Sequence, residues 1–220
     1  MTRAEAKSTA HATREKLLDV AEKLFAKHGF DAVSVRAILR EAGLRNQSAL
    51  QYHFGDREKL ISAIQGRRVK QLEQKRRELL AEALRLDREL EFRDLCGIFV
   101  RAGFELCRDD PSFRNLLGLL GQRLLTSGES LLSIGPLTGS QLEVYDLIMN
   151  TFGTLADMDE TLLQLRMENA NALGLQALSR RARAGDSFRG KRAELFLSNL
   201  VDQLAAMMLA PPSAATLALL

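Results

Sequence analysis

Apolar residues recur every three or four positions along most of the chain, the spacing that places side chains on one face of an α-helix. In the first such segment the apolar stripe runs from Leu17 to Phe25, and Gly29 follows as a helix-ending residue. The pattern therefore predicts a helix over about 13–28, preceded by a loose polar arm over 1–12.

A shorter pattern follows between residues 34 and 60. Ser34 is suited to the N-terminus of a helix, because its hydroxyl can accept a hydrogen bond from a free backbone amide. Gly43 stands where a helix-ending residue with positive φ is wanted. After it, Leu50 and Phe54 are four positions apart and share one face of a second short helix. Two short helices joined by a tight turn are the pattern of a helix-turn-helix.

Beyond this region the helical pattern continues to near the C-terminus. A long helix with alternating charges on its solvated face is expected to begin at Asp56 and run into the eighties. Because no run of alternating β-branched residues predicts a sheet, the expected fold class is all-α. Further helices are expected over 91–108, 111–126, 139–156, 159–183 and 188–209, with a Gly- and Pro-containing loop over 127–140 and a disordered tail over 211–220.

Composition changes this picture only through the distribution of charge. The 220-residue chain has a net charge of +3, and residues 1–60 contain 11 Lys and Arg against 8 Asp and Glu, whereas the remainder contains 20 of each. The whole excess lies in the expected helix-turn-helix region, where cations would neutralise DNA phosphates. The N-terminus lacks the apolar core of a signal peptide, and no stretch approaches the ~20 apolar residues of a membrane span, so a cytoplasmic location is expected.

Few residues are suited to catalysis or metal binding. His11, His28 and His53 all lie in the N-terminal region, and Cys96 and Cys107 are the two cysteines. The two cysteines lie about 16 Å apart along one expected helix, which is too far for a disulfide. They are either ordinary buried residues or sensors of oxidants. Since no zinc-binding, phosphate-binding or nucleophile motif is present, we expect no enzyme, no metal and no cofactor.

Three stretches of sequence carry a specific resemblance. They are TREKLLDVAEKLFAKHGFDAVSV (13–35), EAGL (41–44) and YHFGDREKLI (52–61). In order, spacing and residue type they resemble the DNA-binding domain of the tetracycline-repressor (TetR) family of regulators. Between Gly43 and Phe54 the chain has one residue more than the commonest family pattern, and the excess falls at 44–46.

The resemblance implies which side chains contact DNA. Gln51 is expected to read a base, because its amide can form two hydrogen bonds with the adenine edge. Tyr52 and His53 are expected to contact the DNA backbone, although Tyr52 could instead pack beside Phe54 and His53 could face the helix dipole. Plain solvent exposure is an alternative for every residue of the set. The full set is Ser34, Arg36, Asn46, Gln47, Ser48, Gln51, Tyr52, His53, Arg57 and Lys59.

The resemblance also implies that the C-terminal region dimerises and holds a small-molecule cavity. The expected dimer surface consists of apolar and small residues at helical spacing, namely Leu163, Met167, Ala170, Gly174, Ala177, Leu197, Leu200, Val201, Leu204 and Met208. The alternative is that these stripes pack within one chain. The expected effector site comprises Phe99, Arg101, Phe104, Arg123, Tyr145, Met149, Asn150, Phe152 and Asn169. The alternative is that its apolar members belong to an ordinary core.

Together these observations predict a transcriptional regulator with a three-helix DNA-binding domain over 1–55 and a helical effector-binding and dimerisation domain over 56–210. Its expected partners are a double-stranded, pseudo-palindromic operator, a second copy of the chain and an unidentified small molecule that releases it from DNA, with no membrane involved. The alternative is a helical ligand-binding or interaction protein whose DNA domain is vestigial.

Overall fold

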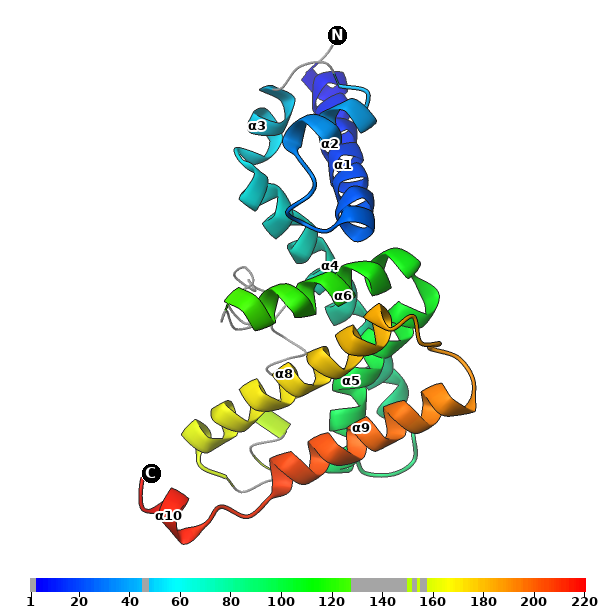
Figure 1. The fold of residues 1–220 in the computed structure, drawn as a ribbon. Helices are drawn as coiled ribbons and strands as arrows, with labels where there is room; N and C mark the ends of the chain where they lie inside the picture. The colour runs from blue at the N-terminus through cyan, green and yellow to red at the C-terminus, as the bar shows by residue number, and fades with distance from the viewer. Residues whose placement is uncertain (1–2, 45–47, 128–149, 152–153, 155–157) are drawn as a thin grey trace. The chain divides into compact units, whose positions relative to one another are not determined.

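The structure, a computed structural model, describes residues 3–44, 48–127, 150–151, 154 and 158–220 (Figure 1). All the regular elements in these ranges are helices, as the apolar pattern predicts. The chain divides into two compact units, Met1–Arg68 and Val69–Leu220. None of the described helices combines the length and the apolarity that a bilayer-spanning segment needs.

Unit 1 consists of three helices and the first part of a fourth. They are α1 (Arg3–His28), α2 (Val35–Glu41), α3 (Ser48–Phe54) and α4 (Arg57–Ala83). Each helix contributes apolar side chains from one face to a common core. That core contains Leu17, Leu18, Ala21, Phe25, Ile38, Leu39, Leu50, Phe54, Leu60, Ile61 and Ile64.

The N-terminal segment differs from the expected loose arm over 1–12. Helix α1 begins at Arg3 rather than near Thr13, and Thr13 donates its hydroxyl to the Thr9 carbonyl 2.9 Å away within it. The first turns contain several alanines, which have the highest helix propensity and allow the helix to extend backwards from its buried part.

The two units meet inside α4, whereas the sequence suggested a boundary at residues 55 and 56. The first three turns of α4 bury Leu60, Ile61 and Ile64 in unit 1, so this stretch belongs to the N-terminal unit by its packing. The remainder of α4 contributes Leu79 and Leu80 to the core of unit 2.

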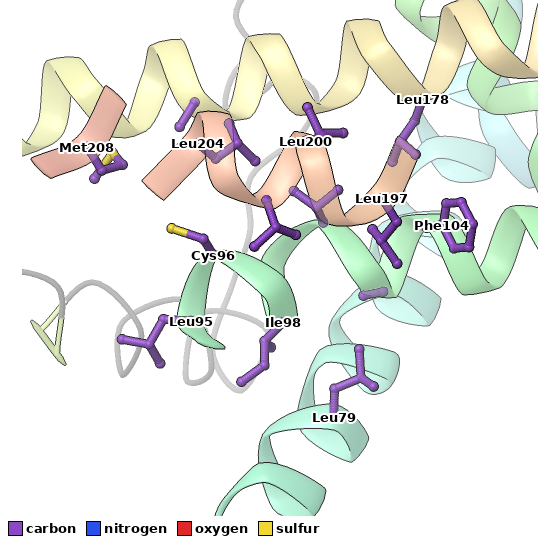
Figure 2. Close-up of a cluster of buried hydrophobic side chains, with 14 of the residues drawn as sticks. Leu79, Leu95, Cys96, Ile98, Phe104, Leu178, Leu197, Leu200, Leu204 and Met208 are labelled. Atoms are coloured by element: carbon purple, nitrogen blue, oxygen red, sulfur yellow. The ribbon is translucent and has the colours of Figure 1, made fainter. Parts of the chain in front are cut away.

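Unit 2 is a helical bundle with one apolar core. Besides the end of α4 it contains α5 (Phe92–Asp109), α6 (Pro111–Ser127), α8 (Glu160–Arg183), α9 (Lys191–Leu209) and the short α10 (Ala214–Leu217). A short connection makes α8 and α9 antiparallel neighbours, and both pack on α5 (Figure 1). Figure 2 shows the core that results, with α5 contributing Leu95, Cys96, Ile98 and Phe104, α8 contributing Leu178, and α9 contributing Leu197, Leu200, Leu204 and Met208.

The residues expected at a dimer surface lie in this core, which is the alternative of packing within one chain. Nine of the ten, Leu163, Met167, Ala170, Gly174, Leu197, Leu200, Val201, Leu204 and Met208, are buried within one chain, and Ala177 is partly buried against the same core. A Cβ at Gly174 would lie 3.6 Å from Val100 of α5, so the small residues of α8 admit α5 rather than a second subunit.

The C-terminal segment also differs from the expected disordered tail over 211–220. Ser213 caps α10 by accepting a hydrogen bond from the Thr216 amide at 3.2 Å, and residues 214–217 are helical. The expected loop over 127–140 and most of the expected helix over 139–156 lie outside the described residues.

Candidate nucleic-acid interface

The turn between α2 and α3 has the local chemistry that its sequence predicts. Ser34 accepts a hydrogen bond from the Ala37 amide at 3.2 Å and so caps α2. At the other end Gly43 has a φ of 68°, a conformation that favours glycine, and the Leu44 amide donates to the Leu39 carbonyl at 2.8 Å. The chain therefore turns sharply after α2.

Helix α3 has a buried face and an exposed face. Leu50 and Phe54 are buried in unit 1. The side chains of Ser48, Gln51 and Tyr52 are exposed, with 78% of Tyr52 accessible. Helix α3 thus presents a hydroxyl, an amide and a phenol to solvent, while its opposite face is held by packing in unit 1. Asn46 and Gln47, also expected to contact DNA, lie outside the described residues.

His53 sits at the edge between the two faces and is half-buried. Burial lowers the pKa of His53 below its ordinary value of 6.5, and the nearby positive charge of Arg14 lowers it further. The Arg14 guanidinium lies 5.1 Å from the centre of the Phe54 ring, which brings a cation from α1 to the end of α3. His53 is therefore neutral at pH 7 and can offer a ring N–H to a phosphate.

Arg57, expected to contact a phosphate, is engaged inside unit 1. Its guanidinium donates to the carbonyls of Phe30 and Val33 in the connection between α1 and α2, and it lies 5.5 Å from the centre of the Phe25 ring. It also pairs with Glu58 at 3.1 Å. These contacts hold the start of α4 against that connection, so Arg57 positions the helix-turn-helix from within.

The remaining expected contacts lie on the surface. Ser34, Arg36 and Lys59 are exposed, although Ser34 already uses its hydroxyl as a cap and Lys59 lies 3.5 Å from Asp56. The exposed Lys16 was missed by the sequence analysis. Its Nζ lies 3.9 Å from the position that a Cβ would occupy at Gly43, so α1 places a cation beside the turn. No sequence motif indicates this position, because 27 residues separate Lys16 from Gly43 along the chain.

A buried ion network joins α1 to α4 within unit 1. Glu22 is only 2% exposed and accepts hydrogen bonds from both Arg67 and Arg68, the latter through Nε at 2.8 Å. Arg67 also donates to Asp19 at 2.6 Å. Charge-assisted bonds of this kind fix geometry strongly when the carboxylate is buried. The network thereby sets the register of α4 against α1 and the rest of the DNA-binding unit.

Comparison with protein families identifies this unit. Residues 17–64, which run from within α1 through α2 and α3 to the first turns of α4, match the model of the bacterial regulatory proteins of the tetR family. The N-terminal unit of this chain therefore matches the TetR family. Two curated repressors, the HTH-type transcriptional repressor AcnR of Corynebacterium efficiens and that of Corynebacterium glutamicum, are 40% and 38% identical to it over 52 residues. The match covers 24% of this chain and 27% of each AcnR chain.

Solved structures extend the likeness to the whole TetR fold. A tetR-family transcription regulator from Shewanella sp. PV-4 superposes with a TM-score of 0.60 at 15% identity, covering 87% of this chain and 95% of that one. A transcriptional regulator from Streptomyces coelicolor A3(2) superposes with a TM-score of 0.52 at 20% identity, covering 90% and 99%. Identities this low establish a shared fold and nothing more.

The residues expected to bind an effector are not brought together in the described part of this chain. Phe104 is buried in the core, 5.3 Å from Phe188 between ring centres, and Phe99 lies under the Arg76 guanidinium. Asn150 and Asn169 are exposed. Arg123 lies on α6 but its side chain, like Tyr145, Met149 and Phe152, is outside what the structure describes.

Arg101 lies at a cleft of about 410 Å³ between the end of α4, α5 and α9. Its lining includes the buried apolar residues Ile98 and Val201 as well as charged ones, of which Arg93 is already bonded to Asp202 at 2.7 Å. Cys96 and Cys107 are buried elsewhere in the core, and burial raises the pKa of each thiol to about 12. Both thiols are therefore protonated at neutral pH, which favours an ordinary structural role over oxidant sensing.

Proposed function

We propose that this chain is a DNA-binding transcriptional repressor that recognises a pseudo-palindromic operator as a homodimer and is released by a small-molecule effector. The observation that carries the proposal is the exposed face of α3, where Ser48, Gln51 and Tyr52 stand outward on a helix anchored by buried Leu50 and Phe54. A helix held in this way after a tight turn can insert its outer face into the major groove.

The charge of the N-terminal residues supports the same function. Exposed Arg36 and Lys59, together with Lys16 beside the turn, can neutralise phosphates on either side of the groove. The AcnR proteins that resemble this region carry the description of repressors, which is the basis for proposing repression rather than activation.

The proposed dimer uses surfaces that the core leaves uncovered. Leu165 and Leu173 are exposed on α8, and Leu195 and Leu209 are exposed on α9. Pairing two chains through these helices would present two copies of α3 to successive major grooves, about 10 bp apart per turn of DNA. Two-fold pairing also provides the contacts that a single helix-turn-helix lacks.

The test is a gel shift with the DNA upstream of the chain's own gene, using intact protein. We expect a retarded complex whose footprint contains an inverted repeat, and an affinity that falls steeply as salt rises because bound phosphates release counterions. The matched variant is Ser48→Ala/Gln51→Ala, which removes groove-facing groups without touching the core. If wild-type protein binds no duplex more tightly than this variant does, the α3 face does not read DNA and a vestigial DNA domain is the better account.

A further inference from the structure

Helix α4 carries a buried ion pair inside unit 2 that is only partly satisfied. Glu73 and Arg76 are 3% and 9% exposed, and Arg76 Nη1 donates to Oε1 of the Glu73 carboxylate. The second carboxylate oxygen, Glu73 Oε2, is buried and has no hydrogen-bond partner in the part of the chain that the structure describes. A buried acceptor left in this state costs about 1–3 kcal/mol, and more when the group is charged.

Among the described residues, no other cation donates a hydrogen bond to Glu73 Oε2. Lys75 points its ammonium to Glu105 on α5, at 2.9 Å, and that contact raises the pKa of Lys75. The Arg76 guanidinium lies 3.9 Å from the centre of the Phe99 ring, so its face is used against α5. Further along the same helix, Leu79 and Leu80 are apolar and buried.

A buried ion pair of this kind adds little net stability to a fold. Replacing a buried pair with apolar side chains of similar volume is often neutral or stabilising, since desolvation offsets the attraction between the charges. What the pair supplies, and an apolar pair would not, is a strong acceptor fixed at a buried position. Ligand sites are built in this way, with a few placed polar groups among apolar ones.

We propose that Glu73 Oε2 is the hydrogen-bond acceptor of the effector site, and that the effector is an uncharged molecule with an O–H or N–H donor on an apolar body. The absence of charge follows from Arg76, which already balances the Glu73 carboxylate. A charged ligand would bring an uncompensated charge into a buried region. The biological role of this site rests on the proposed function, but binding itself requires no DNA.

Thermal melting of the full chain with five small aromatic probes tests this. Benzamide and phenol are neutral donors, benzoate and benzylammonium are charged, and toluene has no donor. At a concentration about ten times the Kd, a bound probe should raise Tm by about 3–6 °C. We expect this shift from at least one of benzamide and phenol and from none of the other three. Equal shifts with toluene or with a charged probe, or no shift with either neutral donor, would overturn the proposal.

Two double variants locate the binding. Glu73→Leu/Arg76→Met replaces the buried pair with apolar side chains and should abolish the shift produced by the neutral donors. The matched control, Lys75→Met/Glu105→Leu, removes the neighbouring ion pair on the same helix and should retain that shift. A folded Glu73→Leu/Arg76→Met protein with a wild-type shift contradicts the assignment. Should this variant not fold, the selectivity of wild-type protein among the five probes still decides the matter. Gel shifts measured without probes report separately on the proposed function.

Discussion

Gln51 is exposed on α3 whereas Arg57 is held inside unit 1, so replacement by alanine should affect them differently. Gln51→Ala should leave the stability of the protein unchanged and relax sequence preference at one base position. A bidentate contact is worth about 1–3 kcal/mol of discrimination, which is the expected loss. Binding measured against a set of duplexes with single-base changes gives this value directly, and uniform weakening across the set would show that Gln51 reads no base.

The main effect of Arg57→Ala should be a loss of folding stability. The variant removes the hydrogen bonds that Arg57 donates to the carbonyls of Phe30 and Val33, which should cost about 1–3 kcal/mol of stability in denaturant unfolding. The dependence of DNA affinity on salt should keep its wild-type slope. A slope that falls by about one with no loss of stability would instead identify Arg57 as a phosphate contact.

His53 makes DNA binding sensitive to pH if it contacts a phosphate. Burial, and then Arg14, lowers its pKa below 6.5 in the free protein, and a phosphate would raise that pKa in the complex. Binding then takes up a proton, so affinity should increase as pH falls through the pKa of the complex and should level off below the pKa of the free protein. Titrations of wild type and His53→Gln between about pH 5 and 8 check this, and an unchanged profile in the variant would assign the effect to another group.

At the scale of elements, two helical glycines should respond in opposite directions to alanine. A Cβ at Gly66 of α4 meets nothing within 4 Å, so Gly66→Ala should raise stability by about 0.4–1 kcal/mol. A Cβ at Gly121 of α6 would overlap Ser179 of α8, so Gly121→Ala should lower stability by about 1–3 kcal/mol. Urea unfolding of both variants tests the pair, and a gain in stability for Gly121→Ala would show that α6 and α8 do not cross as closely as described.

Hydrogen bonds between residues close together in the chain were predictable from sequence, whereas packing partners from distant segments were not. The Ser34 cap and the turn at Gly43 depend on atoms a few residues apart, and the structure confirms both. Periodicity also identified the apolar stripe that contains Leu163 and Leu200, but it indicates a buried face without indicating what covers that face. The stripe packs on α5 of the same chain rather than on a second subunit.

The partners of charged residues were the hardest feature to predict from the sequence. Glu22 lies in a helix with alternating charges and has the pattern of a solvated residue, yet it is buried between Arg67 and Arg68. More than 40 positions separate it from these partners along the chain. Arg57 likewise has partners that are distant in the sequence, because the carbonyls that accept its hydrogen bonds lie far upstream. Contacts between distant segments depend on how the helices pack, and no short motif encodes them.

For the whole molecule, the proposed dimer makes a prediction about association. Leu173 on α8 and Leu195 on α9 are 38% and 69% exposed and lie on faces that the core does not use. Leu173→Arg/Leu195→Arg should therefore convert a dimer into a folded monomer in sedimentation and weaken operator binding. Leu84→Arg is the control, because Leu84 is 63% exposed just after the end of α4. A wild-type monomer, or a dimer that survives the double variant, would rule out this interface.

Tyr52, 78% exposed on α3, also gives the protein an optical reporter at the proposed DNA surface. The chain has no tryptophan and only two tyrosines, the other being Tyr145. In a Tyr145→Phe variant all tyrosine emission should come from Tyr52, and its intensity and anisotropy should change when operator DNA binds. Docking can then be followed in stopped-flow experiments without any attached dye, and an emission that stays constant on saturation with DNA would place Tyr52 away from the duplex.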